Sequence, residues 1–327
     1  MMVPIIRKLI DNKKCFIERV LPVEGVLSVE TGISVEPFDR LGECKFSQNR
    51  IVFPKGFKPS NFKTKKRFYY TGSLLGKAGK QKFIAPCDGS LEVGNDKKYI
   101  FQEAEKRYPL LAGLWGIVKS IQKNKSVLIE TQTKDLLMAA CTEEFVSGEL
   151  VVFPNPTDIL KKYYLENFAK GIKGKIIYIG DCVGTDVVKK AFEMEASAVL
   201  AGSTDVETFN FAKSNNFAFG LISGFGNIKT PDFVYKYLSA VSYRYVFFEG
   251  EKNILRVPVR PEDIKPSKEV LPLVKEVSVG MSVLVLQEPH FGLVTAVDSV
   301  SKSSIFVRFG AEKNSIEIKR PNFFLIE

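Results

Sequence analysis

The sequence contains one histidine, His290, and five cysteines that lie far apart without a CxxC pair. A single histidine excludes metal sites built from two histidines, and any Ser-His-Asp or Cys-His catalytic arrangement would have to use this residue. Scattered cysteines in odd number argue against a disulfide framework or a zinc ribbon and favour free thiols in a reducing compartment. We therefore expect no metal and no cofactor, and a binding protein is favoured over an enzyme.

Long apolar runs are also missing. A membrane-spanning helix needs about 20 consecutive apolar residues, and the longest candidates, such as KIIYIGDCVG, are broken by glycine and aspartate. The first residues, MMVPIIRKLIDNKK, return to charge too soon for a signal peptide. We expect no transmembrane segment and a cytoplasmic location. A length of 327 residues exceeds the usual size of one core, so the sequence predicts two to four domains.

Acidic residues are absent between Cys44 and Cys87, although this stretch holds eleven basic residues. It contributes +11 to a chain whose formal net charge is +10, so the remainder nets to −1. Aromatic residues such as Phe57, Phe62 and Phe68 are interleaved with the basic ones. Basic side chains neutralise phosphates and aromatic rings stack on bases, so this composition suits a polyanion. From this stretch we predict the nucleic-acid contacts Arg50, Lys55, Lys58, Lys63, Lys65, Lys66, Arg67, Tyr69, Tyr70, Lys77, Lys80 and Lys82.

Residues 1–155 are predicted to form a β-rich domain, because short alternating runs are separated by turns rich in glycine, proline and aspartate. Two segments carry a particular pattern: residues 22–44 read PVEGVLSVETGISVEPFDRLGEC, and residues 73–93 read SLLGKAGKQKFIAPCDGSLEV. They resemble the two halves of a biotinyl/lipoyl-type barrel-sandwich hybrid. The resemblance implies a barrel-sandwich-like fold for this part of the chain.

Carrier members of that family attach a cofactor to a lysine in a Met-Lys-Met setting. Here the corresponding region holds Lys97 and Lys98 and no methionine, so the resemblance implies no attached cofactor. The basic stretch, residues 44–87, falls between the two segments. We expect it to be an insertion or long loop that the β domain displays, which suits binding better than packing.

In residues 156–260 the spacing of the apolar residues differs from that in the preceding β-rich part of the chain. A helix is predicted over 156–171, with a cap at Thr157 or Asp158 and Gly171 at its end. From residue 173 the apolar runs KIIYIG, AVLAG, FAFGLIS and RYVFFEG alternate with helical segments of about ten residues. Strands that alternate with helices predict βαβ units, and therefore a small parallel α/β domain.

Glycine-bearing loops follow three of these strands, at the edge where open α/β sheets bind ligands. They show neither GxGxxG spacing nor a Walker lysine, and Asp181, Asp186 and Asp205 would place negative charge where a phosphate would sit. Two interpretations stay open: helix caps with tight turns, or a small-ligand pocket. The pocket would be formed by Gly180, Cys182, Gly184, Thr185, Gly202, Gly224 and Gly226.

Residues 261–275 are rich in proline and charge and predict an extended linker. Residues 276–327 alternate between apolar and polar, with turns at Gly280 and Gly292, and predict a small β-barrel. The run VSVGMSVLV, followed by PHFGLVTAV, resembles a KOW domain, the SH3-like barrel of NusG-type elongation factors and several ribosomal proteins. The pair Thr295-Ala296 stands where that pattern normally has a second glycine. The resemblance implies binding to RNA, ribosomal protein or RNA polymerase, with His290 and Phe291 in an exposed contact loop.

The sequence thus predicts a multidomain α+β protein with a barrel-sandwich-like β domain, a parallel α/β domain and an SH3-like barrel. The expected partner is RNA or DNA, or a ribosome or RNA polymerase. One alternative is a scaffold protein whose basic stretch meets acidic protein partners or a membrane surface. Another is an enzyme with its pocket around Cys182, Asp186 and Gly224.

Overall fold

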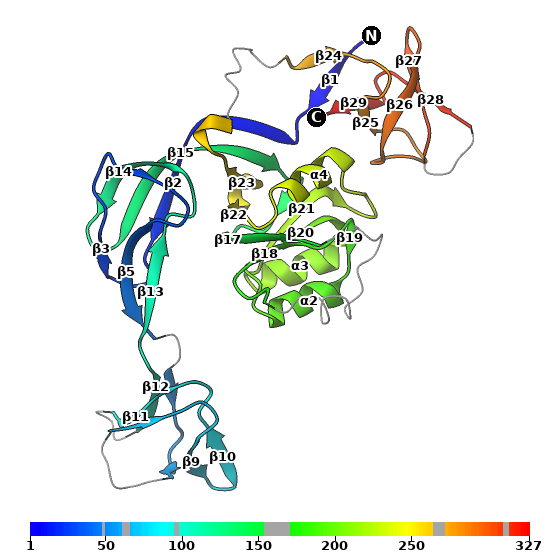
Figure 1. Cartoon of the computed structure of the whole chain (residues 1–327). Coiled ribbons are helices and arrows are strands. Elements are labelled where there is room, and N and C mark those ends of the chain that lie inside the picture. Colours follow the sequence, from blue (N-terminus) through cyan, green and yellow to red (C-terminus); the bar gives the residue numbers. More distant parts are fainter. Residues whose placement is uncertain (48–49, 61–65, 95–97, 154–170, 264–271, 310–313) are drawn as a thin grey trace. The chain divides into compact units, whose positions relative to one another are not determined.

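The chain consists mainly of β-strands, and the part of it that the structure describes has three α-helices (Figure 1). The computed structural model describes residues 1–47, 50–60, 66–94, 98–153, 171–263, 272–309 and 314–327. The chain divides into two units. The first is Met1–Cys15, Gly113–Gly116 and Thr131–Glu327, and the second is Phe16–Ala112 and Ile117–Glu130. This is the multidomain α+β class that the sequence predicts.

A mixed sheet in the first unit contains the predicted parallel strands. Parallel pairing joins β17 (Phe145–Val152), β18 (Ile176–Tyr178), β20 (Ala198–Thr204) and β21 (Ala218–Phe225), and β19 (Cys182–Val183) also pairs with β20. Antiparallel strands continue the sheet: β16 (Ala140–Cys141) beside β21, then β22 (Tyr245–Glu249), β23 (Ile254–Pro258) and β15 (Ser126–Leu137) beyond β17. Two expectations need correction. The boundary expected at residue 155 separates β17 from the strand it pairs with, and β22 is antiparallel.

Helices cover both faces of the parallel strands. α2 (Thr185–Glu193) and α3 (Val206–Ser214) lie on one face, and α4 (Asp232–Ala240) lies on the other (Figure 1). Within β18, Ile177 packs in the core with α2 and α3, whereas Ile176 packs in the core with α4. This is the two-residue alternation of a strand buried on both sides. The helix predicted over residues 156–171 lies almost wholly outside the described residues.

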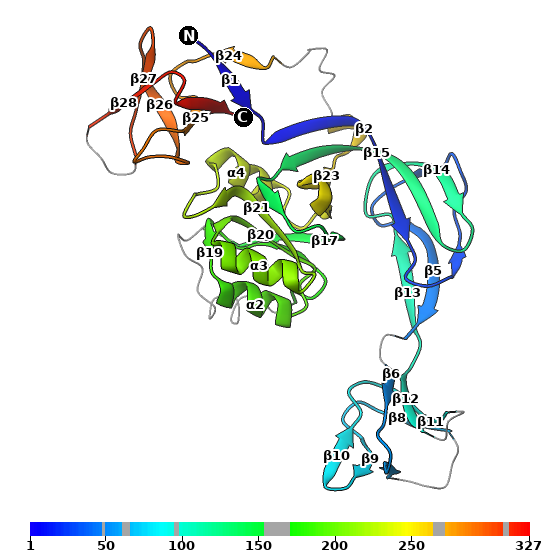
Figure 2. The ribbon, with the colours of Figure 1, turned by 180° about the vertical axis from the view of Figure 1, so that it is seen from behind.

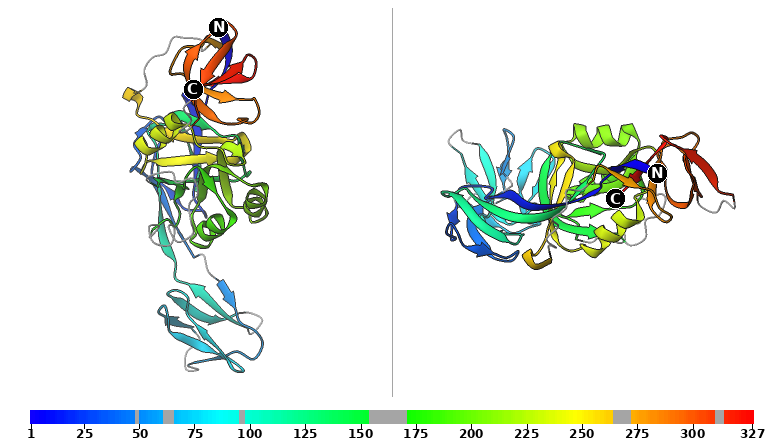
Figure 3. Two further views of the ribbon diagram at one scale, coloured as in Figure 1. Left: turned by 90° about the vertical axis from the view of Figure 1, so that its right-hand side faces the viewer. Right: turned by 90° about the horizontal axis from the view of Figure 1, so that it is seen from above.

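A second sheet of the first unit joins the two ends of the chain (Figure 3). Its strand order is β24 (Val274–Glu276), β1 (Met2–Ile6), β29 (Phe323–Ile326), β25 (Ser282–Val285), β26 (Val294–Val300), β27 (Ser304–Val307) and β28 (Ile316–Lys319). Gly280 and Gly292 have positive φ angles of 84° and 82°, as the predicted tight turns require. Residues 2–6 were expected in the N-terminal domain, but Val3 is fully buried in the core of this C-terminal sheet.

Of the remaining strands before residue 131, some extend the mixed sheet and others form separate sheets. β2 (Leu9–Val20) and β14 (Gly116–Gln122) pair with β15, and β14 also pairs with β4 (Ser34–Val35). β3 (Val26–Leu27), β5 (Arg40–Phe46) and β13 (Lys106–Leu111) form a three-stranded sheet. The segment 22–44 belongs to these sheets, and none of its strands pairs with a described strand of the segment 73–93.

Residues 50–60, 66–94 and 98–103 form two further sheets, and we refer to them as the basic module (Figure 2). One sheet has the order β10 (Gln81–Ile84), β9 (Leu74–Ala78), β7 (Lys58–Pro59). The other has the order β6 (Arg50–Val52), β12 (Tyr99–Glu103), β11 (Gly89–Val93), β8 (Lys66–Tyr69). They share one core, made of Phe53, Phe57, Tyr69, Leu75, Ala85, Leu91 and Phe101.

For residues 44–87 the sequence predicts an insertion or a long loop, and the structure shows that the long-loop alternative is wrong. The stretch contains five strands of the basic module together with much of its core. The physical reason is that several of its aromatic residues are buried rather than exposed. Phe53 and Phe57 are 3% and 6% exposed, and their rings stack with centroids 4.1 Å apart.

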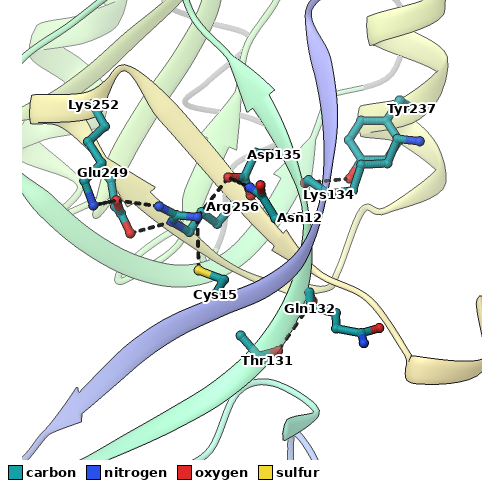
Figure 4. Close-up of polar contacts among 10 residues, drawn as sticks. All are labelled: Asn12, Cys15, Thr131, Gln132, Lys134, Asp135, Tyr237, Glu249, Lys252 and Arg256. Atoms are coloured by element: carbon teal, nitrogen blue, oxygen red, sulfur yellow. Dashed lines mark hydrogen bonds and ion pairs between the residues drawn. The ribbon is translucent and has the colours of Figure 1, made fainter. Parts of the chain in front are cut away.

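A buried cluster of charged and polar side chains around Arg256 connects four strands of the first unit (Figure 4). Arg256 of β23 contacts Asp135 of β15 through Nη1 at 2.9 Å and Glu249 of β22 through Nε at 2.6 Å. The same Nη1 lies 3.0 Å from Sγ of Cys15, and Asn12 donates to the Asp135 carboxylate; both residues belong to β2. The Asp135 side chain is 2% exposed, so its charge depends on Arg256 for compensation.

Replacing Arg256 by methionine should lower the free energy of unfolding by about 3–5 kcal/mol, because the buried carboxylate of Asp135 would lose the cation that compensates its charge. Chemical denaturation measures this loss. The matched control is Lys236→Met at an exposed position of α4, which should change stability by no more than about 0.5 kcal/mol. Equal small effects of the two substitutions would contradict a structural role for this group.

Candidate nucleic-acid interface

Three lysines stand side by side across the three-stranded sheet of the basic module. Lys77 of β9 is directly opposite Lys82 of β10 on one side and Lys58 of β7 on the other. Directly opposite residues of antiparallel strands project to the same face, so the three side chains share one face. All three are exposed. We call Lys58, Lys77 and Lys82 the lysine row; with strands about 4.8 Å apart, it spans about 10 Å.

The inner face of this sheet explains why the lysines point outward. The next cross-strand row consists of Pro59, Gly76 and Phe83, which face the aromatic core. A Cβ atom at Gly76 would lie 2.3 Å from the carbonyl oxygen of Lys58 and 2.6 Å from the ring of Phe57. β9 therefore packs against its neighbours more closely than any side chain at position 76 would allow.

The lysine row has an unfavourable electrostatic energy in isolation. Like charges directly opposite each other destabilise a sheet. Among the residues that the structure describes, no carboxylate lies within ion-pair distance of any of the three ammonium groups. An anionic ligand would relieve the repulsion, so the row is suited to binding a chain of negative charges.

The other predicted basic contacts surround this sheet or lie elsewhere in the module. Arg50, Lys55, Arg67 and Lys80 are exposed. Lys63 and Lys65 lie outside the described residues; Lys66 belongs to β8, but the position of its side chain is not described. The structure therefore brings together three of the predicted basic contacts in register, and it places four more on the surface of the same module.

The predicted aromatic contacts separate into exposed and buried rings. Tyr70 is 70% exposed, as a stacking residue requires. Tyr69 is 6% exposed and belongs to the core, with the guanidinium of Arg67 5.5 Å from its ring centre. The prediction of Tyr69 as a base-stacking contact is therefore wrong, because strand alternation turns its ring inward. Phe68, one of the aromatic residues of the basic stretch that the sequence predicts to offer a stacking surface, is 50% exposed.

The second predicted contact lies in the C-terminal sheet. His290 and Phe291 occupy the connection between β25 and β26. The His290 ring stacks on Phe309 with centroids 4.2 Å apart and an interplanar angle of 8°, while Phe291 is 62% exposed. Both rings thus lie in the connecting segment where the sequence predicts them.

The glycine loops of the α/β sheet are held together by the chain's own polar groups. The backbone N–H of Thr230 donates to Oδ1 of Asp181 at 2.9 Å, and the hydroxyl of Tyr178 donates to Thr230 at 2.8 Å. The backbone N–H of Ile228 donates to the hydroxyl of Ser203 at 3.0 Å. These bonds tie the loops to one another at the carboxyl end of the sheet.

The same loops begin helices. Asp205 caps α3 by accepting from the N–H of Thr208 at 2.7 Å, and Gly184 occupies the cap position of α2. Thr185 and Thr208 share a hydrogen bond of 2.7 Å. A Cβ atom at Gly202 would lie 2.5 Å from the carbonyl oxygen of Asp181. For these positions the structure supports the capping and turn interpretation that the sequence left open.

The described residues contain no group of three or more His, Cys, Asp and Glu side chains that could hold a metal ion. No helix in the described part of the chain is long and apolar enough to span a membrane.

Comparison with known proteins identifies no family for this chain. No protein-family model matches the chain, and no curated protein is similar to it. A solution NMR structure of a UPF0107 protein is similar to 38% of this chain and 98% of its own length, at 13% identity and a TM-score of 0.27. A similarity this low carries no argument about fold or function.

Asp181 should make stability depend on pH. Burial raises the pKa of its carboxyl above the ordinary 3.8, despite hydrogen bonds from Thr230. A carboxyl whose pKa is higher in the folded than in the unfolded protein stabilises the fold fully when the pH is below its unfolded-state pKa. This stabilisation is lost as the pH rises through the pKa of the folded state. Asp181→Asn removes the titration and keeps an acceptor oxygen. Relative to wild type, this variant should gain stability as the pH rises above about 4, which urea unfolding measures; a difference that stays constant with pH would contradict the raised pKa.

Lys77→Gln should stabilise the basic module at low salt, by about 0.5 kcal/mol, because it removes the central charge of the lysine row. The opening free energy from hydrogen exchange of β9 and β10 peptides measures the change. At about 1 M salt the gain should disappear, since exposed charges are screened. Lys123→Gln, at an exposed position outside the module, should give no such gain. A loss of stability in Lys77→Gln would count against charge repulsion in the row.

Proposed function

We propose that this chain is a non-catalytic protein that binds nucleic acid, or a ribonucleoprotein or transcription machine, through the basic module and the C-terminal sheet. The observation that carries the proposal is the lysine row. Three ammonium groups that stand in register, with no ion-pair partner among the described residues, form a linear array of positive charge, which matches the regular negative charge of a phosphate backbone. Contacts to phosphates would be independent of base sequence.

The location of the row supports binding over a purely structural role. Elsewhere in the chain the described lysines and arginines often pair with carboxylates, as Lys252 does with Glu249 at 2.9 Å. In the basic module the lysines instead repel one another across neighbouring strands. Residues that lower stability where they stand are commonly found at functional surfaces.

The C-terminal sheet would provide a second contact. Its five C-terminal strands and its turns at Gly280 and Gly292 support the resemblance to a KOW domain, which remains part of the proposal. The exposed Phe291, in the connection between β25 and β26, would belong to this contact. The resemblance of the 73–93 segment to a biotinyl/lipoyl-type sandwich likewise stays a proposal.

Replacing the lysine row by glutamine (Lys58, Lys77 and Lys82 together) should weaken binding to a uniform single-stranded RNA. The slope of log affinity against log salt should become shallower by about 2, because each phosphate contact of a single strand contributes about 0.7. Fluorescence anisotropy over a salt series measures both quantities.

The matched control removes the same charge from exposed positions of the three helices: Lys189, Lys213 and Lys236 to glutamine. The control should keep the wild-type slope. Equal slopes for all three proteins would contradict the proposed interface. If the wild type binds an acidic protein or anionic vesicles but no nucleic acid, the lysine row serves that partner and the proposed function is wrong.

A further inference from the structure

The outer face of the four-stranded sheet of the basic module carries a second set of exposed groups. Pairing places Arg50 of β6, Gln102 of β12, Ser90 of β11 and Phe68 of β8 in one row across the sheet. Tyr70 follows Phe68 by two residues, and alternation places its ring on the same side. We call Phe68 and Tyr70 the aromatic pair.

The aromatic pair is not part of the hydrophobic core. Its rings are 50% and 70% exposed, and they meet edge to face with centroids 5.4 Å apart. The adjacent row of the same sheet, which includes Leu91 and Phe101, faces inward and is buried. Burial therefore explains the inner rings of this sheet and leaves the two outer rings unexplained.

The charge around the aromatic pair favours an anionic partner. Arg50 stands at the far end of the same row, and β6 and β8 contain no acidic residue. Glu92 follows Ser90 by two residues on the same face, where it accepts a hydrogen bond from the Ser90 hydroxyl at 3.2 Å and stands opposite Lys66 in register. Asp88 accepts from the backbone N–H of Thr71, the residue after Tyr70, at 2.8 Å. The described residues of the module include nine basic and three acidic residues, so its net charge is positive. Exposed rings on a positively charged module are the combination that single-stranded nucleic acids bind, because unpaired bases stack on rings while phosphates contact cations.

We propose that the aromatic pair is a stacking platform for unpaired bases and makes the protein prefer single-stranded over double-stranded nucleic acid; this inference rests on the proposed function. The two sheets of the module enclose one core, so the platform and the lysine row lie on opposite outer faces. In a duplex the bases stack on one another and their faces are not accessible, so the platform adds binding affinity only for single strands.

The test compares three probes at one salt concentration: a single-stranded uridine oligomer, an abasic strand of the same length and charge, and a duplex. Wild type should bind the uridine strand at least about tenfold more tightly than the abasic strand, since each stacked base adds about that much. In the double variant Phe68→Ala, Tyr70→Ala this ratio should fall to near one, with abasic-strand affinity unchanged. The variant Phe68→Tyr, Tyr70→Phe keeps both rings and should keep the ratio.

The possible failures are distinguishable. If wild type binds every probe but shows no preference for bases, or if the alanine variant keeps the preference, the stacking platform is wrong and the proposed function stands. If wild type binds none of the probes at low salt, the proposed function itself is wrong. Because both rings are exposed, the alanine variant should remain folded, and its melting temperature checks this.

Discussion

The aromatic core of the basic module is the constraint on which the candidate interface depends. Phe53 and Phe57 stack on each other, and Phe83 packs edge-on against both. β9 approaches this core so closely that only glycine fits at position 76. Once these groups occupy the inner face, strand alternation directs the lysine row outward and holds its members in register. The array of charge is therefore a consequence of the hydrophobic pattern beneath it.

Charge serves two opposite purposes in this chain. Arg256 is nearly buried, and its guanidinium is shared between two carboxylates that belong to different strands. Removing one partner there leaves a buried charge uncompensated, so the group specifies the packing of the strands around it. The lysine row is exposed and has no such partner among the described residues. It adds nothing to stability, and an external anion is what would complete it.

Local patterns predicted much of the fold, and non-local pairing explains what they missed. The parallel strands and α2, α3 and α4 could be predicted because each apolar run and each helix is signalled by its own residues. The place of β1 beside β29 could not, since the two lie at opposite ends of the chain. In the basic stretch, composition predicted a positive surface. It could not show which ring of Phe68 and Tyr69 is buried, because neighbouring aromatic residues fill both faces of β8.

The most direct test of this account is hydrogen exchange of the whole protein with and without a single-stranded RNA of about 12 nucleotides. Mass spectrometry would locate the backbone amides that the RNA protects. The account predicts protection in peptides from β7, β9 and β10, together with β6 and β8, and little change in α2 and α3. Protection confined to the α/β sheet, with none in the basic module, would contradict it.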